Sequence, residues 1–154
     1  MFNIIRPLIF KFSPEVAHSL AIKALKLNNI SYSKPIDNHI LETTFCEKKL
    51  SSPIGVAAGF DKNAEVYNPL FNLGFGFVEV GTITPKPQFG NPKPRVFRLE
   101  EDEALINRLG FNNSGSEQIS QTIKENNKKG FLGINIGPNK DSKDCLLYTS
   151  DAAD

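Results

Sequence analysis

Tryptophan is absent from this 154-residue sequence, and its two cysteines, Cys46 and Cys145, lie far apart. Neither cysteine has the close spacing to histidine that a zinc site needs, so the sequence predicts no metal site and a reduced protein on the cytoplasmic side. Charge of one sign is also lacking, because 18 basic and 17 acidic residues leave a net charge of +1. We therefore expect no nucleic acid partner.

Long hydrophobic runs are missing too. No apolar stretch approaches the roughly 20 residues of a membrane-spanning helix, and the N-terminus lacks the basic region, apolar core and cleavage site of a signal peptide. We expect a chain that is neither exported nor membrane-spanning. Its apolar and charged fractions, 40% and 23%, are ordinary for a folded domain with a core.

The N-terminal residues predict two short amphipathic helices. Residues 2–12 (FNIIRPLIFKF) are heavily apolar with two basic side chains among them. Ser13, Pro14 and Glu15 fit an N-cap, a proline at the first helical position and an acid in the first turn of a second helix. The two helices could pack on the rest of the domain, or they could lie on a membrane surface with phenylalanine and isoleucine dipping into the lipid.

A polar, turn-rich linker at residues 31–40 separates these helices from an alternation of strands and helices. The expected elements are a hairpin of residues 41–45 and 48–50 turning at Glu47, strands at 53–58, 77–80 and 131–136, helices at 64–73 and 116–129, and an excursion formed by residues 96–99 and 104–106. The order of strands and helices indicates an α/β fold with a parallel sheet or barrel.

Polar, glycine-bearing clusters follow three of the predicted strands, at residues 59–63, 81–84 and 135–137. Ligands of α/β folds bind at the carboxyl ends of parallel strands, so we expect the clusters to converge on one site. Glycine in the first two would let a flat ligand approach the backbone, and Lys62 would project a cation toward it. A single such cluster is typical of a plain turn, but three in register favour a site.

Two further segments are polar. Residues 107–113 (NRLGFNN) carry amide and guanidinium groups that suit a small planar acid, although a solvated loop would have the same composition. Residues 84–95 hold several prolines, which we interpret as stiffening a long loop over the site rather than as a recognition ligand for another protein.

Four segments together resemble the quinone-dependent class of dihydroorotate dehydrogenases, and FSPEVAHSL (12–20) resembles the helical extension of that class. The four segments are AAGFDKN (57–63), GFGFVEVGTITPKPQFGNPKPRVFRL (74–99), INRLGFNN (106–113) and GINIGPNKD (133–141). The resemblance covers residues 1–144. It implies a helical extension at 1–30 and, at 41–144, the first strands of a (β/α)8 TIM barrel, which stays incomplete.

This resemblance implies an enzyme that oxidises dihydroorotate to orotate with FMN, in pyrimidine biosynthesis. The electrons pass to ubiquinone or a related quinone, and the enzyme is peripheral on the cytoplasmic side of the cell inner membrane. The alternatives are a soluble dihydroorotate dehydrogenase linked to fumarate or NAD, and a barrel that binds a ligand without redox chemistry.

The resemblance also assigns candidate site residues by matching positions. The residues matching flavin contacts are Ala58, Gly59, Phe60, Asp61, Lys62, Thr82 and Asn135. Those matching the substrate site are Lys62, Asn107, Arg108, Leu109, Gly110 and Phe111. His18 and Arg98 match the quinone site.

The proton-abstracting serine of the family has no counterpart among the matched residues, so no catalytic residue is named and we expect these 154 residues to be inactive alone. Residues 145–154 (CLLYTSDAAD) do not continue the family pattern. They resemble the translation of a transposase adapter used in sequencing libraries, and we leave them out of the fold prediction.

Overall fold

The computed structural model describes residues 2–27, 39–126 and 130–142. Much of the predicted linker and all of residues 145–154 lie outside these ranges. The elements, in chain order, are α1 (Phe2–Phe10), α2 (Pro14–Leu27), the short 3-10 helix η1 (His39–Leu41), β1 (Thr43–Phe45), β2 (Lys48–Leu50), β3 (Gly55–Val56), α3 (Tyr67–Asn72), β4 (Phe77–Ile83), β5 (Val96–Leu99), β6 (Ala104–Asn107), α4 (Ser116–Glu125) and β7 (Phe131–Ile136).

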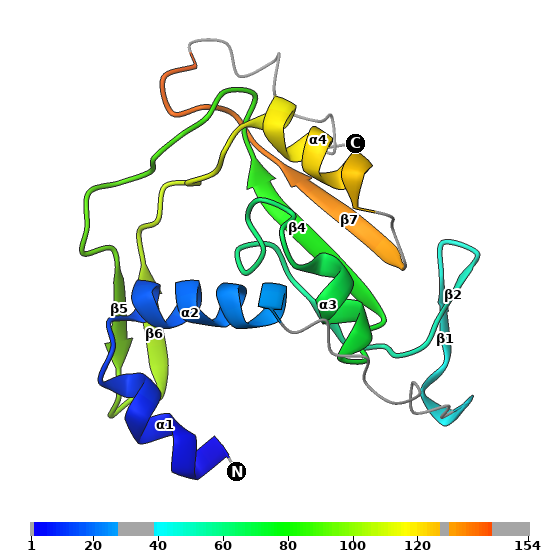
Figure 1. The fold of residues 1–154 in the computed structure, drawn as a ribbon, viewed down its shortest axis with the longest axis horizontal. Helices are drawn as coiled ribbons and strands as arrows, with labels where there is room; N and C mark the ends of the chain where they lie inside the picture. Colours follow the sequence, from blue (N-terminus) through cyan, green and yellow to red (C-terminus); the bar gives the residue numbers. More distant parts are fainter. Residues whose placement is uncertain (1, 28–38, 127–129, 143–154) are drawn as a thin grey trace.

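A three-stranded parallel sheet in the order β3-β4-β7 forms the centre of the fold, with α3 and α4 beside it (Figure 1). Successive side chains of a strand point to opposite faces of a sheet. Val78 and Val80 therefore face the helices and are fully buried, whereas Glu79 between them points to the other face. The predicted α/β class with parallel strands is confirmed, and the described strands do not close into a barrel.

The core joins one face of the sheet to three helices. Burying a large apolar side chain contributes roughly 1.5–3 kcal/mol, so this core is the main source of stability in the described part of the chain. The buried members are Ile22 from α2, Ala64 and Val66 from the loop before α3, Tyr67 and Leu70 from α3, Val78, Val80 and Ile83 from β4, and Ile119 from α4.

Both N-terminal helices are present, and α2 begins at Pro14 as its sequence predicts. Its first backbone hydrogen bond runs from Ala17 N to Ser13 O at 2.9 Å. The helix lies across the β5–β6 hairpin and beside α3 (Figure 1), and its Ile22 enters the core. Packing on the domain therefore accounts for one face of α2. On α1, Ile5 and Leu8 remain 41% and 60% exposed.

Two elements are shorter than the sequence predicts. The strand expected at 53–58 is reduced to β3, because Pro53 has no N–H to donate and Ala58 N donates to a side-chain oxygen of Glu79 rather than to the backbone of β4. The helix expected at 64–73 is reduced to α3, because Ala64 has a φ of +56°, which no right-handed helix allows.

The helix predicted at 116–129 ends at Glu125, where Asn126 turns to an extended ψ of 109°. Its carbonyl oxygen accepts a hydrogen bond from the Tyr67 hydroxyl at 2.6 Å, so a contact with α3 holds the end of α4. β4 is longer than predicted and runs to Ile83.

The β1–β2 hairpin forms where the sequence predicts it, and the excursion predicted at 96–99 and 104–106 is a second antiparallel hairpin. β1 pairs with β2 across Cys46 and Glu47, which have φ values of 46° and 61°. β5 pairs with β6 across the acidic residues 100–103, and this second hairpin lies apart from the central sheet, beside α2 (Figure 1). The β5–β6 hairpin thus faces the loop that follows β3, with a cavity between them.

Candidate active site

Backbone hydrogen bonds join the loops that follow β3 and β4. Gly59 N donates to Gly81 O at 2.8 Å, and Gly81 N donates to Asp61 O at 3.1 Å. Gly81 has a φ of +109°, and a Cβ built there would lie 2.5 Å from the carbonyl oxygen of Asn135 on β7. The three clusters predicted to converge therefore meet at one edge of the sheet, where the close approach requires glycine.

A side-chain network links the same three strands. The Thr82 hydroxyl donates to Asn135 Oδ1 at 2.6 Å, and Asn135 Nδ2 donates to Glu79 Oε1 at 3.1 Å. The second Glu79 oxygen, Oε2, accepts from Ala58 N at 3.4 Å. Three of the residues matched to flavin contacts are thus connected through Glu79, which the sequence analysis had not selected.

Asp61 is buried, with 1% of its surface exposed, and its carboxylate organises the loop before α3. Its two oxygens accept from Glu65 N and Val66 N, each at 2.8 Å. Burial raises the pKa of Asp61, and the two backbone N–H groups act against that rise. Its side chain thus has a structural use, and its backbone oxygen contributes to the strand-end contacts.

Lys62 follows directly and is half-buried. Its Nζ donates to the Gly59 carbonyl oxygen at 2.6 Å, which holds the ammonium group at the loop. Burial lowers the pKa of Lys62, and the Arg95 guanidinium lowers it further, whereas Glu15 and Asp61 raise it. The site therefore contains a cation that is partly withdrawn from water and available to an anionic ligand.

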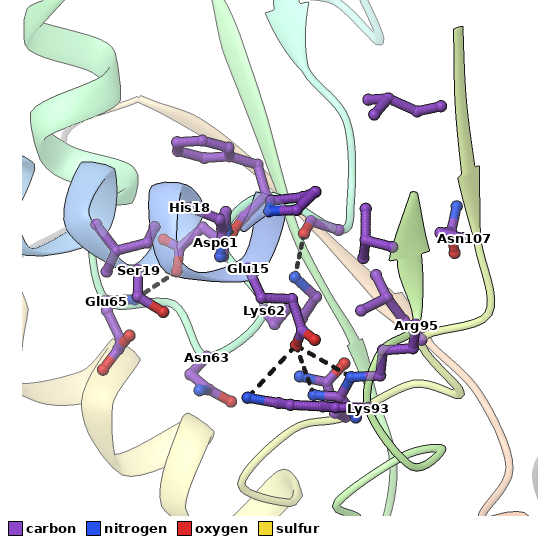
Figure 2. Close-up of a pocket in the computed structure, with 18 of the residues that line it drawn as sticks. Glu15, His18, Ser19, Asp61, Lys62, Asn63, Glu65, Lys93, Arg95 and Asn107 are labelled. Carbon is purple, nitrogen blue, oxygen red and sulfur yellow. Dashed lines mark hydrogen bonds and ion pairs between the residues drawn. The ribbon is translucent and has the colours of Figure 1, made fainter. Parts of the chain in front are cut away.

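A cavity of about 690 Å³ lies between α2, the loop of residues 59–63 and the β5–β6 hairpin. Lys62, His18 of α2 and Asn107 of β6 all line this cavity and are labelled in Figure 2. Thr82 and Asn135 do not line it. The strand-end network and the cavity under α2 thus involve different side chains, and the loop of residues 59–63 contributes to both.

The two residues matched to the quinone site lie on α2 and on the neighbouring strand β5. His18 Nε2 donates to the Phe60 carbonyl oxygen at 2.7 Å, and the two rings meet edge to face with centroids 5.3 Å apart. Arg98 donates to Phe12 O at 2.8 Å and lies 4.4 Å from the centroid of the Phe10 ring. Both line the cavity, which extends from the flavin-matched loop to α2.

The residues of the predicted substrate segment divide into two groups. Asn107 and Leu109 line the same cavity as Lys62. Arg108 instead donates to the Pro94 carbonyl oxygen at 3.1 Å, Gly110 has a φ of +73°, and Phe111 is 54% exposed. Asn107 and Leu109 thus share a cavity with Lys62, whereas Arg108, Gly110 and Phe111 do not line it.

The available groups suit an organic anion or a planar heterocycle more than a metal ion. Around the strand ends they are one ammonium, one hydroxyl, one amide and the carboxylate of Glu79. Within the described ranges, no three histidine, cysteine, aspartate or glutamate side chains are grouped so that they could hold a metal.

A second contact that the sequence analysis missed joins Glu15 of α2 to Arg95. The pair lies 80 positions apart in the chain, so no local pattern predicts it. Glu79 had a visible signal, because it is a lone acid within the otherwise apolar FVEV strand. A charge at a buried strand position indicates a polar partner on the same face of the sheet.

Comparison with protein families finds a match over residues 40–151 to the model described as "Dihydroorotate dehydrogenase". The match reaches into residues 145–154. Among curated proteins, the dihydroorotate dehydrogenase (quinone) of Bartonella henselae is 50% identical over 97% of this chain and 43% of its own length. That of Rhodospirillum rubrum is 50% identical over 90% of this chain and 38% of its own length.

Solved structures give the same result. Dihydroorotate dehydrogenase from Eimeria tenella in complex with ferulenol matches with a TM-score of 0.78 and 42% identity over 86% of this chain and 38% of its own. The ligand-free form from the same organism matches with a TM-score of 0.77. The chain thus spans about two fifths of the length of the relatives that it matches.

Proposed function

The chain belongs to the dihydroorotate dehydrogenase family, and from this membership we propose that the protein oxidises dihydroorotate to orotate and passes the electrons to a membrane quinone, in pyrimidine biosynthesis. The observation that carries the proposal is the position of Lys62. Its ammonium donates to Gly59 O in the strand-end loop, and the same side chain lines the cavity under α2.

FMN is the proposed cofactor, and the residues present fit it. Glycine at 59 and 81 keeps the strand ends free of Cβ atoms, and the Thr82 and Asn135 side chains supply hydrogen-bonding groups beside them. The chemistry that FMN supplies when bound is the acceptance of two electrons from the substrate. Ala58, Phe60 and Asp61 contribute through the loop backbone that connects these groups.

Lys62 has two tasks in this proposal. Its cation stabilises the negative charge that reduction leaves on the pyrimidine part of the cofactor, and it binds the carboxylate of the substrate. Asn107 and Leu109 line the same cavity and orient the substrate ring, because correct orientation lowers the barrier to hydride transfer. Arg108, Gly110 and Phe111 complete the matched segment and hold its loop.

The quinone is proposed to use the part of the same cavity under α2 that His18 and Arg98 line. His18 contacts the backbone of Phe60, so the wall of this cavity is in direct contact with the loop proposed to hold the cofactor. Arg98 lies at the other end, against Phe10 and Phe12. An apolar acceptor would thus enter between α2 and the β5–β6 hairpin.

Peripheral attachment to the cytoplasmic side of the inner membrane is the proposed localisation. The apolar side chains of the first two helices and the turn between them that remain exposed include Ile5, Leu8, Phe12, Val16 and Leu20. Basic residues accompany them, as in helices that lie in a membrane surface. No helix in the described part of the chain is long and apolar enough to cross a bilayer.

The test is a spectroscopic assay on the full-length protein. We expect a yellow protein whose visible absorption is bleached by dihydroorotate and restored by a short-chain quinone analogue. Restoration by fumarate or NAD instead would indicate the soluble class, and a colourless protein would indicate a barrel that binds a ligand without redox chemistry.

A further inference from the structure

We propose that Glu79 is a positioning residue for the flavin site, whose carboxylate sets the direction of the hydrogen bonds made by Asn135 and Thr82. This inference rests on the proposed function and adds to it a residue that no comparison assigns. Glu79 lies on the face of β4 opposite the core and bonds to the segments on both sides of this strand, through Ala58 N after β3 and Asn135 Nδ2 on β7.

An ionised carboxylate accepts hydrogen bonds and donates none. Because Glu79 Oε1 takes a hydrogen from Asn135 Nδ2, the amide of Asn135 must turn its oxygen away from Glu79 and toward Thr82. That oxygen then accepts from the Thr82 hydroxyl at 2.6 Å. The orientation of an amide is decided by its hydrogen-bond network, and here the acceptor-only group is Glu79.

The consequence is a defined polarity at the strand ends. The Thr82 hydrogen is used within the network, which leaves the hydroxyl oxygen as an acceptor. The second hydrogen of Asn135 Nδ2 is left as a donor. An acceptor beside a donor is complementary to an N–H beside a C=O, the pattern on the pyrimidine edge of a flavin.

The position of Glu79 favours this role over an ion pair. Among the described residues, Glu15 and Glu65 form ion pairs with basic side chains, whereas no cation lies within ion-pair distance of Glu79. Val78 and Val80, on either side of it, face the helices and fill the core. Glu79 thus makes its contacts on the face opposite the core.

The experiment compares four forms of the full-length protein: unmodified, Glu79→Gln, Asn135→Asp, and the double variant with both changes. Glu79→Gln keeps the size of the side chain but places an NH2 group where an oxygen accepted. Asn135→Asp sets a second carboxylate against Glu79. In the double variant, the new amide on β4 can accept from Ala58 N and donate to the new carboxylate on β7, which can still accept from Thr82.

FMN affinity of the apoprotein is the first readout. Each single variant should bind FMN roughly ten- to a hundredfold more weakly, as expected for losing hydrogen bonds to a charged group. The double variant should not recover this affinity, because an aspartate at position 135 has no N–H to serve as the donor beside the Thr82 oxygen. Glu101→Gln makes the same chemical change on an exposed side chain of the β5–β6 turn and should leave the affinity unchanged.

Thermal melting of the apo forms is the second readout, and it does not depend on the cofactor. If the unmodified protein binds no FMN, the proposed function fails, and the positioning role is then decided by melting alone. Recovery of melting temperature in the double variant relative to Asn135→Asp supports it. Losses that simply add in the double variant, or an unaffected Glu79→Gln, overturn it.

Discussion

Arg95 donates two hydrogen bonds to one carboxylate oxygen of Glu15, from Nε at 3.0 Å and from Nη2 at 2.9 Å. Its Nη1 donates to the carbonyl oxygens of Phe89 and Asn91. A single, nearly buried guanidinium thus ties α2 to the proline-rich loop before β5. Arg95 therefore joins α2, on one side of the cavity, to the loop on its other side.

Replacing Arg95 with methionine should destabilise the protein by about 3 kcal/mol, because Glu15 would be left partly buried without its partner. Denaturant unfolding would measure the change, and limited proteolysis would report whether α2 is released. Lys93→Met is the matched control. Lys93 lies 3.8 Å from the same carboxylate but its side chain is 69% exposed, so we expect less than about 1 kcal/mol. Equal losses of stability in both variants would show that the Glu15–Arg95 pair does not hold α2 in place.

Removing the cation of the site should affect chemistry more than folding. We expect Lys62→Met to slow flavin reduction by dihydroorotate roughly 10²- to 10³-fold, the usual effect of losing one group that stabilises developing charge. Stopped-flow bleaching of the flavin would measure it. Lys49→Met changes an exposed lysine of β2 and should leave the rate as it was.

The same lysine predicts a pH dependence. Because burial lowers the pKa of Lys62 below its usual 10.5, the ammonium is lost at a lower pH than that of an exposed lysine. Orotate affinity should therefore be constant below the lowered pKa and fall as the pH rises through it. Calorimetric titrations across the alkaline range would show this. Lys62→Arg should bind with a flat profile, since arginine stays charged, and an identical decline in that variant would exclude Lys62 as the cause.

Gly81→Ala should cost about 1–3 kcal/mol or more and weaken cofactor binding, because the new Cβ would lie 2.5 Å from Asn135 O. Gly74→Ala is a matched control with a φ of +98° and nothing within 4 Å of its Cβ. Both variants share the backbone strain of a positive φ, so only Gly81→Ala should lose FMN affinity beyond its loss of stability. Similar FMN affinities would contradict the close approach.

Membrane attachment can be tested on the exposed face of α1. Leu8 is 60% exposed, and Leu8→Glu should lower partitioning onto anionic lipid vesicles by tenfold or more, as expected for withholding one leucine from an apolar phase. Leu73→Glu alters a 44% exposed leucine at the end of α3 and should not change sedimentation with vesicles. If both variants partition like the unmodified protein, α1 is not the contact surface.

Several elements could be predicted from short stretches of sequence. α2 begins at Pro14, the β1–β2 hairpin turns at Cys46 and Glu47, and β7 covers the predicted residues. Each depends on interactions between residues close in the chain: a proline at a helix start, a two-residue turn, and a run of apolar side chains. The convergence of the glycine clusters followed in the same way, from the general geometry of parallel strands.

The remaining features depend on contacts between distant residues. α3 starts late because Ala64 has a left-handed backbone, and β3 ends early because Ala58 N is taken by Glu79. The pair Glu15–Arg95 and the orientation of Asn135 arise only when separate strands and helices are packed together. Local sequence was enough for the elements and the edge of the sheet that carries the site, because those follow from periodicity and turn chemistry. Which polar groups face one another was decided by tertiary packing, because a buried donor or acceptor takes whichever partner the fold brings within reach.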